Sequence, residues 1–309
     1  MGSPLDSSQY VRLLDARLRE VSEGEKKYQE LASMIPTLFK VLPSDSAWEE
    51  FYSIGAVPDI PEFNGKITYL SQSPGYHSKI EPKEWAGGLI AERKLIDDKK
   101  YPVLENRSQS LMRSAMRTRE KQAVRAFNLA FSSAFDYMTT EENVSLCNSS
   151  HTTKSGTSTA DGFDNAGNTK FSKVAVVATR LIMRKFRNDI SERIQPSNNI
   201  GLVVPDFLAD AAYELVKSEK DSTSANNTVE MNYNRYKIIP YMLLDDNSTT
   251  NWFMVDLDGM KDDLIWIDRI SPETKNTVDY ETYQLKQAVY FRCAYGYRDW
   301  RWIYGHNVT

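Results

Sequence analysis

The longest helical pattern of the chain runs from Pro102 to Phe135, with the sequence PVLENRSQSLMRSAMRTREKQAVRAFNLAFSSAF. Pro102 suits a first helical turn, and neither Gly nor Pro follows until well past Phe135. Apolar residues recur at spacings of three, four and seven and so share one face: Met112, Met116, Ala123, Phe127, Ala130, Phe131 and Ala134. The pattern predicts one core helix about 50 Å long, at about 1.5 Å per residue.

A row of basic residues lies beside this apolar face at i, i+4 spacing: Arg113, Arg117, Lys121 and Arg125. Over the whole helix, six basic residues stand against Glu105 and Glu120, which leaves a local net charge of +4. Such a row is typical of the solvated side of a core helix.

The composition describes a folded protein without an obvious chemical site. With 309 residues the chain is long enough for about two domains, and its net charge of -4 argues against a dedicated nucleic-acid binder. Cys147 and Cys293 form no CxxC pair and are interpreted as reduced thiols, with one disulfide left open. No window approaches 18 uninterrupted apolar residues, so no membrane span is expected.

Residues of catalytic and ligand-binding type do not converge. His77, His151 and His306 lie in separate segments with no carboxylate at ligand spacing, and no phosphate-binding or nucleophile motif occurs. Cys147 has His151 four residues on, but within a Ser/Thr-rich loop over residues 148–168 that should not hold a catalytic pair. We therefore expect no enzyme activity, no metal and no cofactor.

The segments before the long helix need a surface to pack on. Residues 9–42 are predicted to be helical with a break at Gly24, and such a segment has to dock within the protomer or on a neighbour. Residues 54–98 are punctuated by Pro and Gly, and residues 66–70 and 89–93 have strand character. They predict a long projecting β-hairpin, which is barely stable alone.

After the long helix, helices are predicted over residues 171–194 and 207–218, the second capped by Asp206. Strands are predicted over residues 200–204, 236–244, 251–257, 264–270, 280–297 and 301–304. This order indicates an α+β protein whose first and last segments meet in one domain. The final strands alternate aromatic and basic residues, which favours packed aromatics but is compatible with stacking of single-stranded bases.

Several of these segments, in this order, resemble the major capsid proteins of tailed bacteriophages, which have the Hong Kong 97-type capsid fold. Residues 83–98 (KEWAGGLIAERKLIDD) resemble the returning strand of that family's extended loop and its approach to the spine helix, and the stretch that follows, with residues 127–131 (FNLAF), resembles the spine helix itself. Residues 200–208 (IGLVVPDFL) with Ala211-Ala212 resemble the strand–Pro–helix unit of the axial domain. Residues 236–244 with 251–256 (NWFMVD) resemble later axial strands, and residues 295–301 (YGYRDWR) resemble the last strand.

The resemblance covers roughly residues 54–305 and implies a division of the chain. An N-terminal arm would span residues 1–53, an extended β-hairpin loop 54–98, and a peripheral domain with the spine helix 99–140. An axial domain would span 141–262, and residues 263–309 would return to the peripheral domain.

The implied function is a structural one: self-assembly into an icosahedral head shell that encloses double-stranded DNA. Candidate inter-subunit residues are Lys66, Tyr69, Tyr76, Lys79, Trp85 and Arg93. The basic row would face the lumen and soften repulsion with packaged DNA by non-specific contact. Implied partners are further copies in hexamers and pentamers, a portal and a separate scaffolding protein, since only about 50 residues precede the loop. Assembly is expected in the cytoplasm of a host bacterium.

Two alternatives stay open at this point. One is an encapsulin-like bacterial nanocompartment shell, which shares the fold but holds enzyme cargo. The other is a single-stranded nucleic-acid-binding protein that uses the aromatic C-terminal strands. Cross-linking between a loop lysine and an asparagine of a neighbour, as in some family members, is not carried over, because no motif identifies the asparagine.

Overall fold

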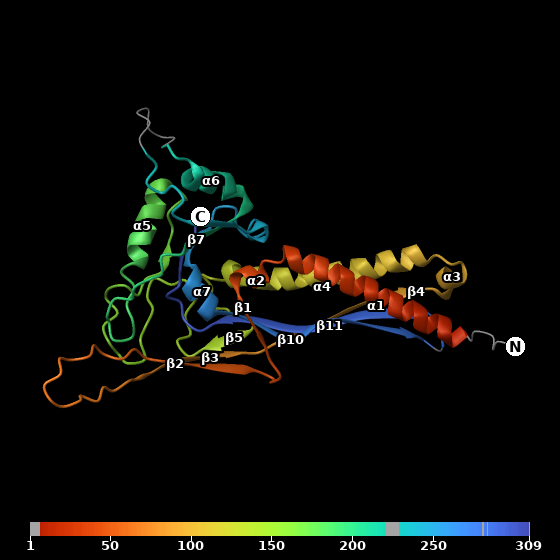
Figure 1. Cartoon of the computed structure of the whole chain (residues 1–309), viewed down its shortest axis with the longest axis horizontal. Coiled ribbons are helices and arrows are strands. Elements are labelled where there is room, and N and C mark those ends of the chain that lie inside the picture. The colour runs from red at the N-terminus through yellow and green to blue at the C-terminus, as the bar shows by residue number, and fades with distance from the viewer. Residues whose placement is uncertain (1–6, 221–228, 280, 283, 309) are drawn as a thin grey trace.

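The computed structural model describes residues 7–220, 229–279, 281–282 and 284–308, with side chains from residue 15 onward. The molecule has a long platform that carries an upper lobe at one end (Figure 1). Its helices are α1 Ser7–Ala32, α2 Ile35–Leu38, α3 Arg93–Asp97, α4 Tyr101–Asn128, α5 Lys173–Met183, α6 Ala209–Lys217 and α7 Leu257–Asp263, with 3-10 turns η1 Asp206–Leu208 and η2 Met242–Leu244. Its strands are β1 Lys40–Pro43, β2 Glu49–Ile54, β3 Pro74–Ile80, β4 Lys83–Ala91, β5 Met138–Thr140, β6 Ala166–Gly167, β7 Ile200–Val204, β8 Lys237–Pro240, β9 Trp252–Asp256, β10 Leu264–Val278, β11 Leu285–Tyr297 and β12 Ile303–His306.

The long helix forms as predicted, but it ends at Asn128, seven residues early. The apolar face is buried through Met112, Met116, Ala123 and Phe127. The residues after α4 use their polar groups locally: the Ser132 hydroxyl accepts from the Ala134 amide, and the Ala130 carbonyl accepts from the Cys147 amide. These hydrogen bonds replace the helical ones, so the apolar residues after residue 128 lie in a turn and do not extend the helix.

Helix α1 is continuous through Gly24, so the predicted break is wrong. A Cβ at this position would meet no atom within 4 Å, which places Gly24 on the open side of the helix. One glycine costs a helix only about 1 kcal/mol relative to alanine. Packing against α4 offsets that cost, because Ser22 and Ser108 are both fully buried and hydrogen-bonded to each other at 2.7 Å. The N-terminal segment therefore docks within the protomer.

The platform sheet brings the two ends of the chain together, as predicted. Its strand order is β1-β10-β11-β4, with β1 parallel to β10 and the long β10–β11 pair antiparallel. α4 is tied to this sheet by Arg119, whose guanidinium lies 2.7 Å from the Asp268 carboxylate on β10. The predicted helix over residues 9–42 is wrong at its end, where Lys40–Pro43 form β1, because these four residues acquire a strand partner only from the far end of the chain.

The upper lobe contains the five-stranded sheet β6-β12-β9-β7-β8. α5 packs on β9 and β12, whereas α6 packs on β7 and β8, so the two helices cover different parts of the sheet. α5 is shorter than the helix predicted over residues 171–194, and Ser172 caps it by accepting from the Ala175 amide. Asp206 does not cap α6; the Asp245 carboxylate instead accepts from the amide of Asp206 at 3.0 Å.

The third sheet, β2-β3-β5, carries the projecting loop. The hairpin consists of β2 and β3, joined by residues 55–73. Residues 66–70 form no strand, because nothing in the described chain lies alongside them to accept their hydrogen bonds. The strand predicted at 89–93 is the end of β4, which starts at Lys83 and pairs with β11 of the platform. The predicted pairing of residues 66–70 with 89–93 is therefore wrong, while a projecting loop is present (Figure 1).

Candidate assembly surfaces

The loop over residues 55–73 exposes apolar side chains on both of its arms. Tyr69 is 91% exposed and Ile60 is 88% exposed. Large apolar residues at least half exposed along it are Val57, Ile60, Phe63, Ile67 and Tyr69. Contiguous exposed apolar surface of this kind marks an interaction site in a folded protein.

The base of this loop is held in place by backbone contacts. The Gly55 amide donates to the Ser73 carbonyl at 2.8 Å, and the Gln72 side chain donates to the Gly55 carbonyl. A Cβ on Gly55 would lie 2.6 Å from the Ser73 carbonyl oxygen, so this close approach requires glycine. The loop thus leaves the sheet in a defined direction although its tip contacts nothing else that the structure describes.

Two of the six predicted inter-subunit residues, Lys66 and Tyr69, lie on this loop and are exposed. Tyr76 and Lys79 lie on β3 and contact their own chain instead. The Tyr76 hydroxyl is 2.8 Å from the Thr152 hydroxyl, and the Lys79 ammonium lies 4.4 Å from the centre of the Trp48 ring. The structure therefore groups the first two residues on one surface and engages the other two inside the protomer.

The remaining two predicted residues lie elsewhere. Trp85 is on β4 and stacks on Phe291 of β11 with a 6.4 Å centroid distance. Arg93 begins α3, at the opposite end of the long axis from the loop (Figure 1), and its guanidinium is 3.4 Å from Asp97. The six residues consequently do not form one site.

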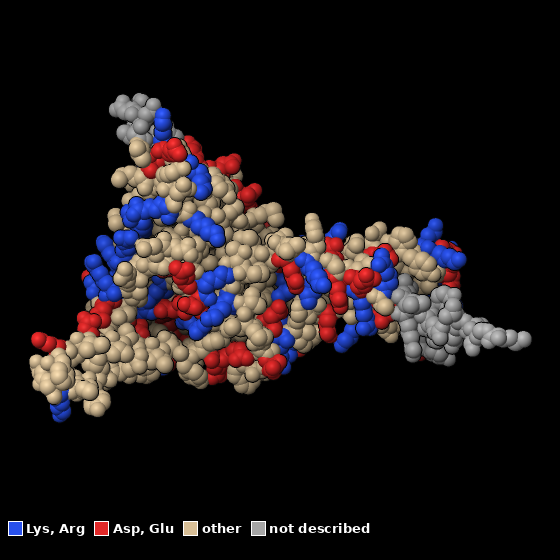
Figure 2. Space-filling model, in the orientation of Figure 1, with Lys and Arg blue, Asp and Glu red and all other residues tan. Residues whose placement is uncertain are grey.

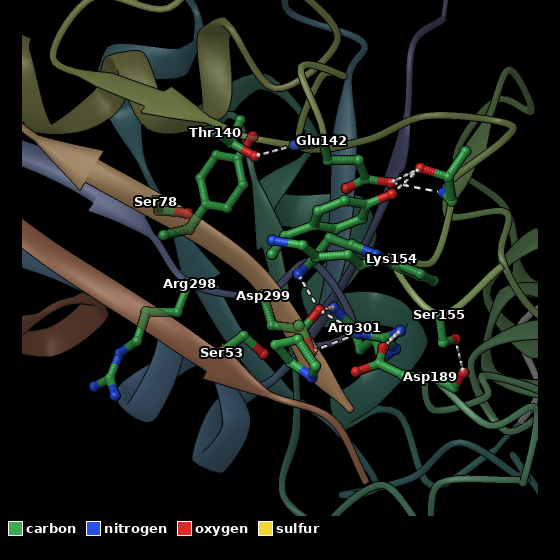
Figure 3. A pocket seen from close by; sticks show the side chains of 16 residues that line it. Ser53, Ser78, Thr140, Glu142, Lys154, Ser155, Asp189, Arg298, Asp299 and Arg301 are labelled. Carbon is green, nitrogen blue, oxygen red and sulfur yellow. Dashed lines mark hydrogen bonds and ion pairs between the residues drawn. The ribbon is translucent and has the colours of Figure 1, made fainter. Parts of the chain in front are cut away.

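A polar cleft lies between the β2–β3 hairpin, residues 152–155 and the segment that follows β11 (Figure 3). Its cavity of about 40 Å³ is bordered by the Arg301 guanidinium, which lies 2.8 Å from both Asp299 and Asp189. Arg298 points away from this cluster, toward the ring of Phe51 (Figure 3). These ion pairs tie Asp189 to the segment over residues 299–301, more than 100 residues later in the chain.

His151, expected in a surface loop without companions, is buried beside this cleft. Its Nδ1 lies 3.1 Å from Glu142, its Nε2 lies 3.1 Å from the Asn165 side-chain oxygen, and its ring stacks on Trp300 at 4.1 Å. The partners are 9, 14 and 149 residues away in sequence, so no local spacing could have revealed them. Burial raises the pKa of the Cys147 thiol, which keeps the thiol protonated and inert.

The four residues of the predicted basic row of α4 differ in whether an acidic residue of the same chain neutralises them. Arg113 forms a 2.7 Å ion pair with Glu25 of α1, and Arg125 pairs with Asp136. The carboxylates of the same chain therefore neutralise both of these arginines. Arg117 and Lys121 are exposed, and neither has an ion pair with any residue that the structure describes.

The aromatic C-terminal strands are packed inside the protein. Phe291, Tyr295, Trp300, Trp302 and Tyr304 are each at most 6% exposed. Bases cannot stack on rings that are already covered. The packed-aromatic interpretation of this segment is confirmed, and the single-stranded nucleic-acid binder loses the surface on which it depended.

Metal-binding clusters and membrane-spanning helices are both absent from the described residues. No group of three or more His, Cys, Asp or Glu side chains is arranged to hold a metal ion. No helix there combines the length and the hydropathy that crossing a bilayer requires.

Solved structures similar to this chain come from phages and related particles. A structure from Mycobacterium phage Patience has a TM-score of 0.58 at 9% identity and covers 96% of this chain and 88% of its own. The mature capsid of bacteriophage PhiM1 gives 0.55 at 10% identity, with 88% and 85% covered. The capsid of an empty GTA particle gives 0.54 at 11% identity, with 90% of both chains covered. At such identities the likeness establishes the fold.

Sequence comparison gives the family. No curated protein matches the chain in sequence. The sequence profile of a phage capsid protein family matches residues 77–305, which include α4, the upper lobe and the C-terminal strands. Together with a fold shared with capsid structures, this match shows that the chain is a structural protein belonging to the phage capsid protein family.

Proposed function

We propose that copies of this chain assemble into the closed icosahedral head shell of a tailed phage, with hexamers and pentamers as the repeating rings. The observation that carries the proposal is the apolar loop over residues 55–73, which projects from the β2–β3 hairpin and has no partner surface among the described residues (Figure 1). A neighbouring copy would supply that surface. Contacts between different surfaces of identical chains generate rings and closed shells.

The energetics of the loop support a partner. Covering one large apolar side chain contributes roughly 1.5–3 kcal/mol. The five exposed apolar side chains of the loop would therefore contribute several kcal/mol to each contact between copies, while they contribute little to the fold of a single copy.

The proposed contents are double-stranded DNA, held by non-specific contact. The exposed pair Arg117 and Lys121 would face the lumen and reduce the repulsion between the DNA and a chain of net charge -4. Assembly in the host bacterial cytoplasm, a scaffolding protein and a portal are carried over from the family resemblance.

The loop can be tested with full-length protein. In the variant F63S/I67S/Y69S, three exposed apolar side chains become small and polar. The matched control E62Q/N64S/T68S changes three neighbouring polar residues and keeps the apolar ones. Sizing chromatography with negative-stain microscopy should show shells, tubes or rings for wild type and control, and folded monomers for the apolar-loop variant.

Two results would contradict the proposal. One is normal shells from the apolar-loop variant; the other is a wild-type chain that stays monomeric at every concentration and salt, with a scaffold supplied. Absorbance at 260 and 280 nm of filled shells then distinguishes a DNA-containing head from a compartment with protein cargo.

A further inference from the structure

The two sides of the upper lobe carry opposite charge. Figure 2 shows Lys and Arg gathered over the α5 side of the lobe, and Asp and Glu over the α6 side. We call the first the basic flank, with Arg180, Arg184 and Lys185 on and after α5 and Arg235 before β8. We call the second the acidic flank, with Asp206, Asp210 and Glu214 on η1 and α6.

The basic flank contains a pocket built to take an anion. A cavity of about 80 Å³ is lined by Arg180, Arg184 and Arg235 together with Tyr236, Ser197 and apolar residues such as Met254. Tyr236 is only 4% exposed and lies next to Arg180, yet neither its hydroxyl nor the Nε of Arg180 makes a hydrogen bond of normal geometry. Unpaired buried donors of this kind cost free energy until a ligand accepts from them.

The chain itself supplies no anion to this pocket. Within the described residues, none of the three arginines forms an ion pair. The acid behind Ser197 is Asp256, and its oxygens already accept from the Ser197 amide and hydroxyl and from the Gly259 amide. The pocket therefore presents three positive charges and a phenol hydroxyl, a set suited to a carboxylate or a phosphate.

The acidic flank offers exposed carboxylates. Asp210 and Glu214 lie at i, i+4 spacing on one side of α6, and Asp206 lies on η1 just before the helix. None of them forms an ion pair with a described residue. Phe207, 71% exposed, and Tyr213, 43% exposed, lie among them, so this flank also offers apolar area for a contact.

We infer that the basic flank of one copy binds the acidic flank of the next, with carboxylates of α6, Asp210 and Glu214, entering the arginine pocket. The inference rests on the proposed shell assembly and names the contact that closes its rings. Because the flanks lie on different sides of the lobe, each copy uses both of them at once and the contact is heterologous. Charge complementarity of this kind selects the correct partner and its register.

A protein carboxylate fits the pocket better than a DNA phosphate. Residues 141–262, which form the upper lobe except for β12, carry 13 Lys and Arg against 17 Asp and Glu, a net charge of -4. A lobe with this balance repels a polyanion as a whole, while a small pocket in it can still accept a single carboxylate. The second copy also brings its own apolar residues to the contact, which a phosphate backbone does not.

Charge reversal tests the inference in the full-length chain. Variant A is R184E/R235E, variant B is D210R/E214R, and variant C combines all four substitutions. A and B should each fold, as judged by circular dichroism, but form at least tenfold fewer rings and shells than wild type by sizing chromatography and negative stain. Variant C carries every substitution and restores opposite charges across the contact, so it should assemble.

Mixing A with B gives a sharper readout. An A copy can contact only B copies on both sides, so the two must alternate around a ring. Alternation is possible in a six-membered ring and impossible in a five-membered one. The mixture should therefore give hexamers, flat sheets or tubes, but no pentamers and no closed shells.

Each other outcome overturns the inference in a recognisable way. If A and B assemble like wild type, or if C and the mixture stay monomeric while folded, the flanks do not meet and the shell proposal survives. If A forms normal shells that have lost DNA, the pocket faces nucleic acid. If wild type itself never assembles, the proposed function fails and this inference fails with it.

Discussion

Among single residues, Asp263 links the stability of the chain to pH. It ends α7 next to the turn before β12, where burial and then the negative charge of Asp299 raise its pKa from 3.8 to about 7. In the unfolded chain the same carboxyl group has its ordinary pKa. Between about pH 4 and pH 7 the folded state therefore holds a proton that the unfolded state has lost, and the free energy of unfolding falls as pH rises through this window.

Replacing this group with a neutral amide should remove the effect. We expect D263N to be more stable than wild type at pH 7.5, by up to about 4 kcal/mol at roughly 1.4 kcal/mol per pKa unit, and equally stable near pH 4. Urea unfolding of the unassembled chain across this range measures the difference. As a control, D246N alters an exposed carboxylate away from this group and should retain the wild-type pH profile. Parallel profiles for D263N and wild type would show that Asp263 ionises normally.

At the scale of elements, the sequence predicts those whose residues are close together along the chain. The face of α4 follows from the spacing of Met112, Met116, Ala123 and Phe127, and all four are buried. The strand Ile200–Val204 is continuous apolar sequence ended by a proline, and it appears where expected as β7. Local periodicity is sufficient in these cases because the helix or strand buries its own contiguous residues.

Elements that depend on distant partners could not be placed this way. β1 is a strand only because β10, more than 220 residues later, lies beside it. Residues 66–70 have strand propensity but no neighbour to pair with, so they remain a loop. The arginine pocket could not be predicted from sequence for the same reason. Arg180 and Arg184, on or just after α5, lie near Arg235 only because of the order of strands in the upper sheet.

The basic row on α4 gives a prediction at this scale, because its two pairs differ in their partners. R117Q/K121Q removes two exposed charges, so the free energy of unfolding should change by less than about 0.5 kcal/mol while the DNA content of filled shells falls. R113Q leaves Glu25, whose side chain is 7% exposed, without its cation and should lower the free energy of unfolding more than R117Q/K121Q does. Urea unfolding of the free chain and the 260/280 nm absorbance of filled shells measure the two effects. An unchanged DNA content in the R117Q/K121Q shells would show that the basic row does not act on DNA in the lumen.

Considered as a whole molecule, the protein keeps its core and its contact surfaces apart. The two ends of the chain and α4 are packed into the platform, whereas the loop over residues 55–73 and the two flanks of the upper lobe extend away from it (Figures 1 and 2). Substitutions on these extensions should therefore change assembly without unfolding the subunit. This separation is what a shell subunit needs, because each copy must fold before its neighbours arrive.

The same separation predicts how a protease distinguishes free from assembled protein. Lys66 is exposed on a loop that has no strand partner, so trypsin should cut after it readily in the free chain. In a shell the loop would lie on a neighbouring copy, and cleavage at this position should slow by at least tenfold. A time course read by mass spectrometry follows the Lys66 cut specifically, and K66Q, which lacks the site, identifies the fragments that arise from it. Equal cleavage rates in monomers and shells would mean that the loop stays uncovered, and that the contacts between copies are made by the flanks of the upper lobe without it.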